Sequence, residues 1–104
     1  MAEFEIESLK ESFIQLGKMV QKYGKGYYKA QLKILSNMIV IIDSDCVLSE
    51  KEKYIIDYYK SLFSGKGDMS EFYIHDDDYK MRIFLNEPLD KLKDGLWDIM
   101  KNYL

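Results

Sequence analysis

Apolar residues recur at intervals of three and four along much of this 104-residue chain, and this spacing limits the folds open to it. The first such stretch carries Ile6, Leu9, Phe13, Leu16 and Val20. A helix of 3.6 residues per turn places all five on one side, so the spacing predicts an amphipathic helix. Gly24 and Gly26, which follow directly, are expected to end it.

A second helix is expected from about Tyr27 to Ile42, where Asp43-Ser44-Asp45 favours a turn. Its predicted inner side carries Tyr28, Leu32, Leu35, Met38 or Ile39, and Ile42. The run from Met38 to Ile42 is uniformly apolar, and periodicity alone leaves open whether it is a buried helix end or a central strand.

Two further helices are expected towards the carboxyl end. Ser49 and Glu52 have the spacing of a capping box, which predicts the start of a third helix that Gly65 and Gly67 would close. Its inner side would carry Ile55, Tyr58, Tyr59 and Leu62. The fourth helix is predicted to begin near Asn86, with the only proline in its first turn. Its inner side would carry Leu89, Leu92, Leu96, Ile99 or Met100, and Tyr103.

Between these two helices, aromatic and branched residues flank Asp76-Asp77-Asp78. Glu71–His75 and Tyr79–Leu85 therefore predict a short β-hairpin with the aspartates at its tip. The alternative is an irregular loop pinned by the same apolar side chains. The expected fold is mainly α, a single domain over residues 1–104 with four helices and this hairpin between the last two.

Composition indicates a folded, soluble protein, because 47% of the residues are hydrophobic and 32% are charged. Cys46 is the only cysteine, which excludes an intramolecular disulfide and any site built on several thiolates. The acidic start is unlike a signal peptide, and the longest apolar run is too short to cross a bilayer. We expect a cytoplasmic protein with no membrane partner.

No group of residues predicts a reaction. His75 is the only histidine, and no nucleophile lies near it in sequence. Asp76 to Asp78 could gather a divalent cation, but turn formation is the simpler interpretation of three adjacent aspartates. Gly65-Lys66-Gly67 lacks the phosphate-binding pattern GxxxxGK[ST]. We therefore expect no enzyme, no metal and no cofactor.

Charge is distributed unevenly along the chain. The span from Ser12 to Ile42 has five lysines and no acidic residue, whereas Gly67 to Asp78 has five acidic residues and no basic one. The net charge of −3 argues against a dedicated nucleic-acid binder. An acidic segment suits a basic protein partner, and the alternative is a solvated charged loop.

The stretch from Leu62 onward resembles a family of small, uncharacterised bacterial proteins. The matching residues are Leu62, Phe63, Gly65, Gly67, Met69, Ser70, Phe72, Ile74, Asn86, Glu87, Leu89 and Leu92. Met69-Ser70 stands where the family has a glycine-serine step, and Tyr73-Ile74 where it has asparagine-aspartate. Some members of that family are encoded beside polymorphic or contact-dependent inhibition toxins. The resemblance implies an immunity protein that binds a cognate toxin domain, such as a nuclease, and covers its active cleft.

Under this hypothesis the partner-binding residues are Asp76, Asp77, Asp78, Tyr73, Tyr79 and Glu71. The carboxylates would lie where a nuclease binds phosphates, and the tyrosines would supply contact area. The main alternative is a regulatory helical module that self-associates near Tyr54, Tyr58 and Tyr59 without a toxin partner. A third hypothesis is nucleic-acid binding through the lysines from Lys18 to Lys33. The oligomeric state and the identity of the toxin stay open.

Overall fold

The computed structural model describes residues 1–63 and 69–104, and these residues form four α-helices and no β-strand. The helices are α1 (Glu3–Tyr23), α2 (Lys29–Asp43), α3 (Leu48–Leu62) and α4 (Tyr79–Met100). The predicted mainly α fold with four helices is confirmed. The glycines expected to close the third helix, Gly65 and Gly67, lie outside the described residues.

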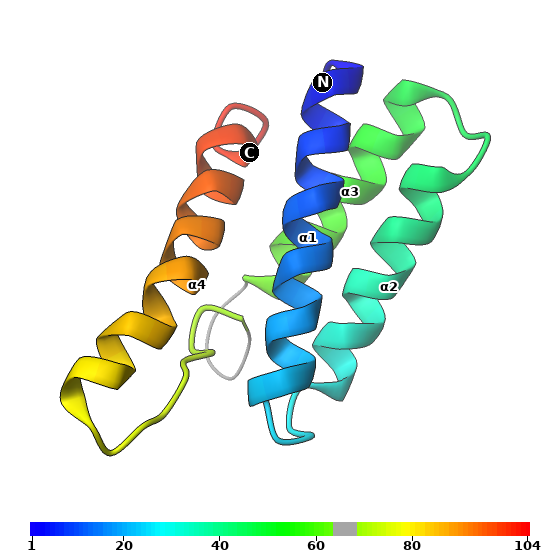
Figure 1. Ribbon diagram of the computed structural model, residues 1–104. Coiled ribbons are helices and arrows are strands. Elements are labelled where there is room, and N and C mark those ends of the chain that lie inside the picture. The colour runs from blue at the N-terminus through cyan, green and yellow to red at the C-terminus, as the bar shows by residue number, and fades with distance from the viewer. Residues whose placement is uncertain (64–68) are drawn as a thin grey trace.

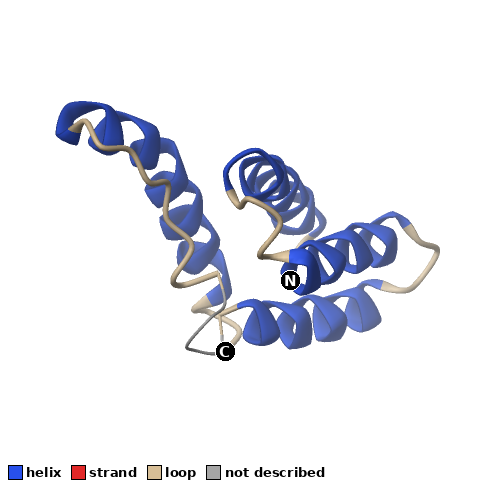
Figure 2. Ribbon diagram, turned by 90° about the horizontal axis from the view of Figure 1, so that it is seen from below, coloured by secondary structure: helices blue, strands red, loops and turns tan. Residues whose placement is uncertain are grey.

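The helices form a bundle of three with a fourth helix along one side (Figure 1). α1 packs against α2 and against α4, and α2 packs against α3. α4 runs antiparallel to α1, and its first turns diverge from the other helices towards one end of the molecule (Figure 1). Figure 2 shows the segment that precedes α4, within residues 69–78, running alongside this helix. The molecule is elongated as a result, with extents of 47 × 24 × 22 Å.

The core contains the apolar residues that recur at helical spacing. All five predicted residues of α1 are buried, and α2, α3 and α4 contribute the following buried apolar residues: Leu35, Met38, Ile42, Ile55, Tyr59, Leu62, Leu89, Leu96 and Met100. Met69, Phe72 and Ile74, which precede α4, complete this core. The run from Met38 to Ile42 is a helix end, although Val40 is exposed.

The predicted start of the last helix was wrong. α4 begins at Tyr79, two turns before Asn86, so Pro88 lies inside the helix. An internal proline lacks the amide hydrogen for one helical hydrogen bond and typically costs about 3 kcal/mol. Burial of Leu89, Leu96 and Met100 along the same helix offsets that cost.

The predicted hairpin is also wrong, because Tyr79–Leu85 is helical and residues 72–76 are extended without a neighbouring strand. The Asp78 carboxylate accepts a hydrogen bond from the backbone N–H of Lys80 at 3.2 Å, which caps α4. This cap and the buried helical side chains outweigh the β-propensity of the aromatic and branched residues.

The predicted capping box on the third helix is not formed. α3 begins at Leu48, and Val47 occupies the capping position without a side-chain hydrogen bond. Ser49 is already helical, and the Glu52 carboxylate instead accepts a hydrogen bond from the amino group of Met1. Glu52 therefore bonds a residue far away in the sequence and not the nearby Ser49.

Candidate functional site

The extended segment 72–76 is held to α4 mainly by one asparagine. The side-chain oxygen of Asn86 accepts a hydrogen bond from the Ile74 N–H at 2.9 Å, and its side-chain nitrogen donates to the Ile74 carbonyl at 2.8 Å. The same nitrogen donates to the Arg82 carbonyl at 2.9 Å. Asn86 is only 5% exposed, so these bonds satisfy a polar group that would be costly to bury alone.

Two basic side chains of α4 hold the ends of the same segment. Lys93 donates to the Phe72 carbonyl at 3.0 Å, and Arg82 donates to the Asp76 carbonyl at 3.2 Å. Both side chains thus act on backbone carbonyls of the segment, which has no sheet partner.

The alternation of an extended chain decides which side chains of this segment are exposed. Phe72 and Ile74 are buried, and the Tyr28 ring meets the Phe72 ring edge-on at 5.2 Å. Tyr73 and His75 are exposed, and their rings lie edge to face with centroids 5.3 Å apart. Tyr73 is therefore open to solvent, and its role in binding a partner stays a prediction.

Two of the three central aspartates have local structural roles. The Asp76 carboxylate accepts a hydrogen bond from the Asp78 N–H at 2.9 Å, and Asp78 caps α4. Asp77 is exposed and takes no part in either bond. All three negative charges lie at the amino end of α4, where the helix dipole favours them. The aspartates therefore mark the start of α4, and the prediction that they form a hairpin tip was wrong.

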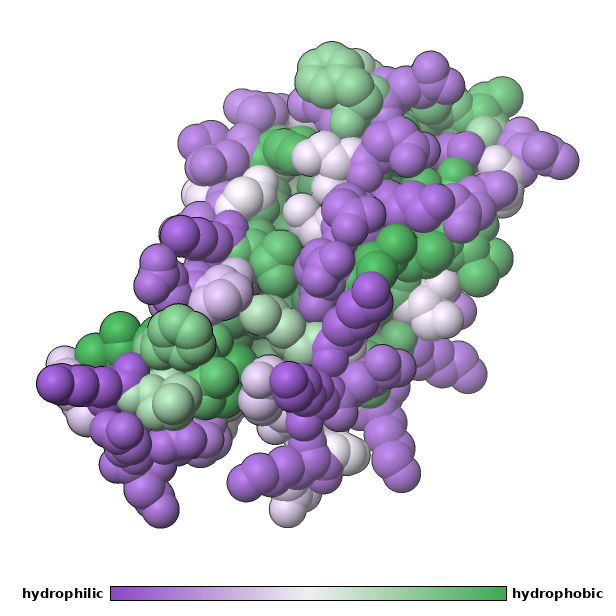
Figure 3. Space-filling model, viewed as in Figure 1, coloured by the Kyte–Doolittle hydropathy of each residue, from purple (hydrophilic) through white to green (hydrophobic). Residues whose placement is uncertain are grey.

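Exposed apolar side chains gather beside these aspartates. The first turns of α4 carry Tyr79, Met81, Ile83 and Phe84, with exposed fractions of 65%, 44%, 52% and 69%. We call residues 76–84 the α4 start. Figure 3 shows apolar side chains grouped at this end of the molecule. A cluster of this kind, bordered by charges, is typical of an interaction surface.

Further carboxylates follow the α4 start along the outer side of the helix. Ile83, Glu87, Asp90, Asp94 and Trp97 recur at intervals of three and four and are all exposed. Glu87 pairs with Lys91 at 3.2 Å. Among residues 1–63 and 69–104, no ion pair involves Asp90, Asp94 or the three aspartates of the α4 start.

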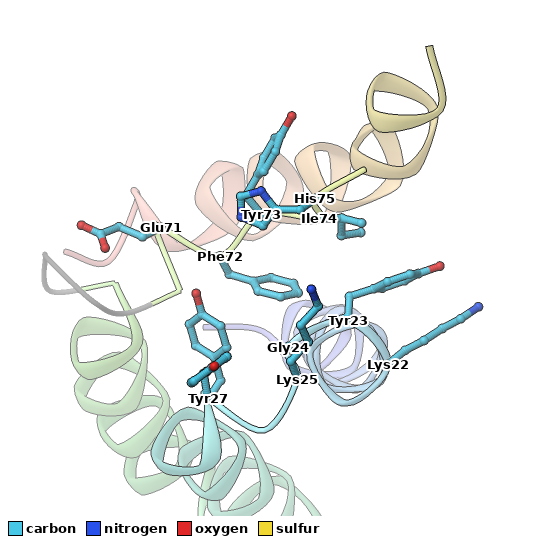
Figure 4. Close-up of a pocket in the computed structure, with 11 residues that line it drawn as sticks. Lys22, Tyr23, Gly24, Lys25, Tyr27, Glu71, Phe72, Tyr73, Ile74 and His75 are labelled. Atoms are coloured by element: carbon cyan, nitrogen blue, oxygen red, sulfur yellow. The ribbon is translucent and has the colours of Figure 1, made fainter. Parts of the chain in front are cut away.

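A pocket lies on the opposite side of the segment from most of these residues. It has a volume of about 360 Å³ and is lined by Lys22, Tyr23, Gly24, Lys25, Tyr27, Tyr28, Glu71, Phe72, Tyr73, Ile74 and His75. Figure 4 shows that it opens between the α1–α2 connection and the extended segment. In this view the Phe72 ring points into the pocket, whereas Glu71 points away from it (Figure 4).

The predicted partner-binding residues therefore fall into two groups. Glu71 and Tyr73 line the pocket, whereas Asp76, Asp77, Asp78 and Tyr79 belong to the α4 start. Sequence reasoning missed Met81, Asp90, Asp94 and Trp97 as exposed neighbours. It placed Ile83 and Phe84 in a strand or, in the alternative, among the side chains that anchor a loop. If the last helix had been predicted to start earlier, its helical periodicity would have placed these residues on the side away from Leu89 and Leu96 and so indicated that they are exposed.

The pKa shifts lie away from these surfaces. The Tyr103 hydroxyl donates to the Glu5 carboxylate at 2.6 Å, which lowers the pKa of Glu5 and raises the pKa of Tyr103. Burial raises the pKa of Tyr59, which belongs to the core. Tyr59 is consequently unavailable for the self-association hypothesis, although Tyr54 is exposed and stacks on Tyr58 with centroids 6.3 Å apart.

The structure offers no prepared metal site within its described ranges, where no three histidine, cysteine or carboxylate side chains are grouped to hold an ion. None of the helices in the same ranges is both long and apolar enough to cross a membrane. Comparisons with protein-family models, curated proteins and solved structures found nothing that matches the chain.

Proposed function

We propose that this chain is a non-catalytic immunity protein that neutralises a basic toxin domain by binding it through the α4 start. The observation that carries the proposal is the joint exposure of apolar side chains and of the Asp77 and Asp78 carboxylates, neither of which forms an ion pair within the described residues. The stretch from Leu62 onward resembles a family of which some members are encoded beside toxins, and this resemblance supports the choice of partner.

The apolar side chains supply the binding energy in this proposal. Tyr79, Ile83 and Phe84 are each more than half exposed, so a partner that covers them removes apolar area from water. Tyrosine and other aromatic side chains are common at the energetic centres of protein interfaces. Tyr73 lies on the adjoining segment and extends the same surface.

The carboxylates select the partner. Asp77 and the neighbouring aspartates repel a polyanion such as nucleic acid and attract lysine and arginine side chains. A nuclease cleft must be basic to hold its substrate, so its surface would be complementary to the α4 start. Binding there would block the cleft without any reaction by the immunity protein.

The test is to co-express the chain with the toxin domain encoded beside its gene, and to measure growth and complex formation. We expect growth rescue and a stable one-to-one complex. The triple variant Asp76→Ser, Asp77→Ser, Asp78→Ser should weaken binding by roughly tenfold or more, because close interfacial charge pairs are lost. Serine also caps helices well, so α4 should remain folded.

The matched control removes the same charge elsewhere, with Glu7, Glu11 and Asp57 each changed to Ser. These residues are exposed and lie on α1 and α3. Binding should be nearly unchanged in this control. Equal losses in the two triple variants would remove the α4 start from the interface, and the absence of both rescue and complex would favour a helical module without a toxin partner.

A further inference from the structure

The pocket beside the α1–α2 connection has the features of a small-molecule site. Its volume of about 360 Å³ is within the usual range for such sites, and most of its lining is aromatic or aliphatic. The ring of Phe72 points into it, while Tyr27 is 84% exposed at its edge (Figure 4). Phe72 is only 2% exposed and forms the floor, so a flat aromatic ligand would contact mainly the exposed Tyr27 ring without any change in the core.

The charge of the pocket is positive. Lys22 and Lys25 both line it, and Lys18, Lys29 and Lys33 are exposed on the adjoining turns. The Lys22 ammonium already lies over the Tyr23 ring, 5.1 Å from its centroid. Within the described ranges the Lys25 ammonium has no hydrogen bond or ion pair, and Figure 4 shows it extending towards Phe72.

The backbone at Lys25 is unusual and supports a specific role for this side chain. Its φ is +53°, and no other non-glycine residue in the described ranges has a positive φ. This left-handed conformation follows a helix end, where glycine is usual because other residues are strained there. Residues held in such conformations at a cost are concentrated at binding sites.

The neighbouring glycine keeps the floor of the pocket in place. A Cβ on Gly24 would lie 2.4 Å from the Val20 carbonyl oxygen and 3.2 Å from the Tyr28 ring. A side chain on Gly24 would therefore force its neighbours to shift. The turn itself comes at Lys25, because Gly24 still has helical dihedral angles, with φ −80° and ψ −7°. The Tyr27 N–H then closes this turn by donating to the Gly24 carbonyl at 3.0 Å.

We propose that this pocket binds a small planar aromatic anion of the nucleoside monophosphate type. The ring of the ligand contacts the aromatic lining, and its anionic group is bound by the Lys25 ammonium. Glu71 is the only carboxylate residue in the lining, and it points away from the pocket (Figure 4). The site shares Tyr73 with the proposed toxin interface, whereas Asp76 to Asp78 and Tyr79 do not line it.

The test is a titration of the full chain with 5′-AMP, with adenosine and with inorganic phosphate, followed by amide NMR at Gly24 and Gly26. We expect saturable shifts with 5′-AMP, and at least tenfold weaker binding of adenosine and of phosphate. Equal binding of phosphate alone would overturn the aromatic part of the proposal. No shifts at millimolar 5′-AMP would overturn the site.

Lys25→Gly gives the sharpest variant, because it should act in opposite directions on stability and binding. Glycine relieves the backbone strain, so the thermal midpoint should rise, while 5′-AMP binding should weaken at least tenfold. Lys33→Ala removes an exposed lysine that does not line the pocket, and it should bind nearly as well as the unchanged chain.

Equal weakening by Lys33→Ala would show general attraction to the basic surface and would overturn the role of Lys25. Tyr27→Ser is the second variant, and it changes a side chain that is not part of the core. It should weaken 5′-AMP binding and leave phosphate binding unchanged. Unchanged 5′-AMP binding in both Lys25→Gly and Tyr27→Ser would overturn the proposal.

Discussion

The three-helix part of the molecule and the α4 region are stabilised in different ways. In α1, α2 and α3, apolar residues at helical spacing pack into one core, and most exposed positions are polar. In the α4 region, polar side chains fix a backbone segment, and large apolar side chains of the α4 start remain in solvent. The first part contributes mainly core residues, whereas the α4 region contributes core residues on one side and an exposed apolar surface at its start.

The largest expected effect is in the three-helix part. Phe13→Ala should lower the free energy of unfolding by about 3 to 5 kcal/mol, because it leaves a cavity where a fully buried ring was packed. Phe4→Ala is the matched control, since Phe4 lies on the same helix and is 77% exposed. Urea unfolding followed by circular dichroism would measure both. Similar losses in the two variants would contradict the assignment of the core.

An intermediate effect is expected where the two parts meet. Asn86→Ala should cost about 1 to 3 kcal/mol, because the N–H and carbonyl of Ile74 lose their partner. The loss should be partly local, so hydrogen exchange of the Ile74 amide should quicken more than that of α1 amides. Asn37→Ala, at an exposed position on α2, is the control. Uniform acceleration across the chain would mean that the segment and the core unfold together.

The smallest effect on stability is expected at the α4 start. Phe84→Ser should change the free energy of unfolding by no more than about 0.5 kcal/mol, because the ring is largely in solvent already. The same change should weaken toxin-domain binding measurably, since it removes apolar contact area from the proposed interface. If Phe84→Ser is stable and binds the toxin domain as well as the unchanged chain, the ring is not part of the interface. If the variant is strongly destabilised, the ring belongs to the core.

The two parts also differ in how many of their features could be predicted from the sequence. Spacing alone predicted all five buried residues of α1, because a helix must bury its apolar side somewhere. It could not predict the role of Asn86, because the bonding partner Ile74 lies twelve residues away and the pairing depends on the tertiary fold. The pocket was missed for the same reason, since Lys25 and Phe72 come together only after α1 and the extended segment have packed.

Tyr79–Leu85 was predicted as one strand of a hairpin because its residues have the composition of a strand. Tyr79, Ile83 and Phe84 favour strands when they can pack on a sheet, but no sheet is present in the described part of the chain. Asp78 supplied the one local signal for a helix, and it was assigned to a turn. The predicted strand was therefore wrong, and the role of Tyr79 as a contact residue stays a prediction.

The pairing of Asn86 with Ile74 has a consequence for the register of the chain. A primary amide can pair with any peptide group, so Asn86 holds the segment without specifying which residue it holds. The alternation of buried and exposed side chains fixes the register instead. A slip by one residue would carry Tyr73 and His75 inward and expose Phe72 and Ile74. One side chain thus makes the pair of backbone hydrogen bonds that a neighbouring strand would otherwise make. A single residue inserted between Ile74 and Asp78 would be absorbed before α4, because Asn86 holds both Ile74 and the helix in place.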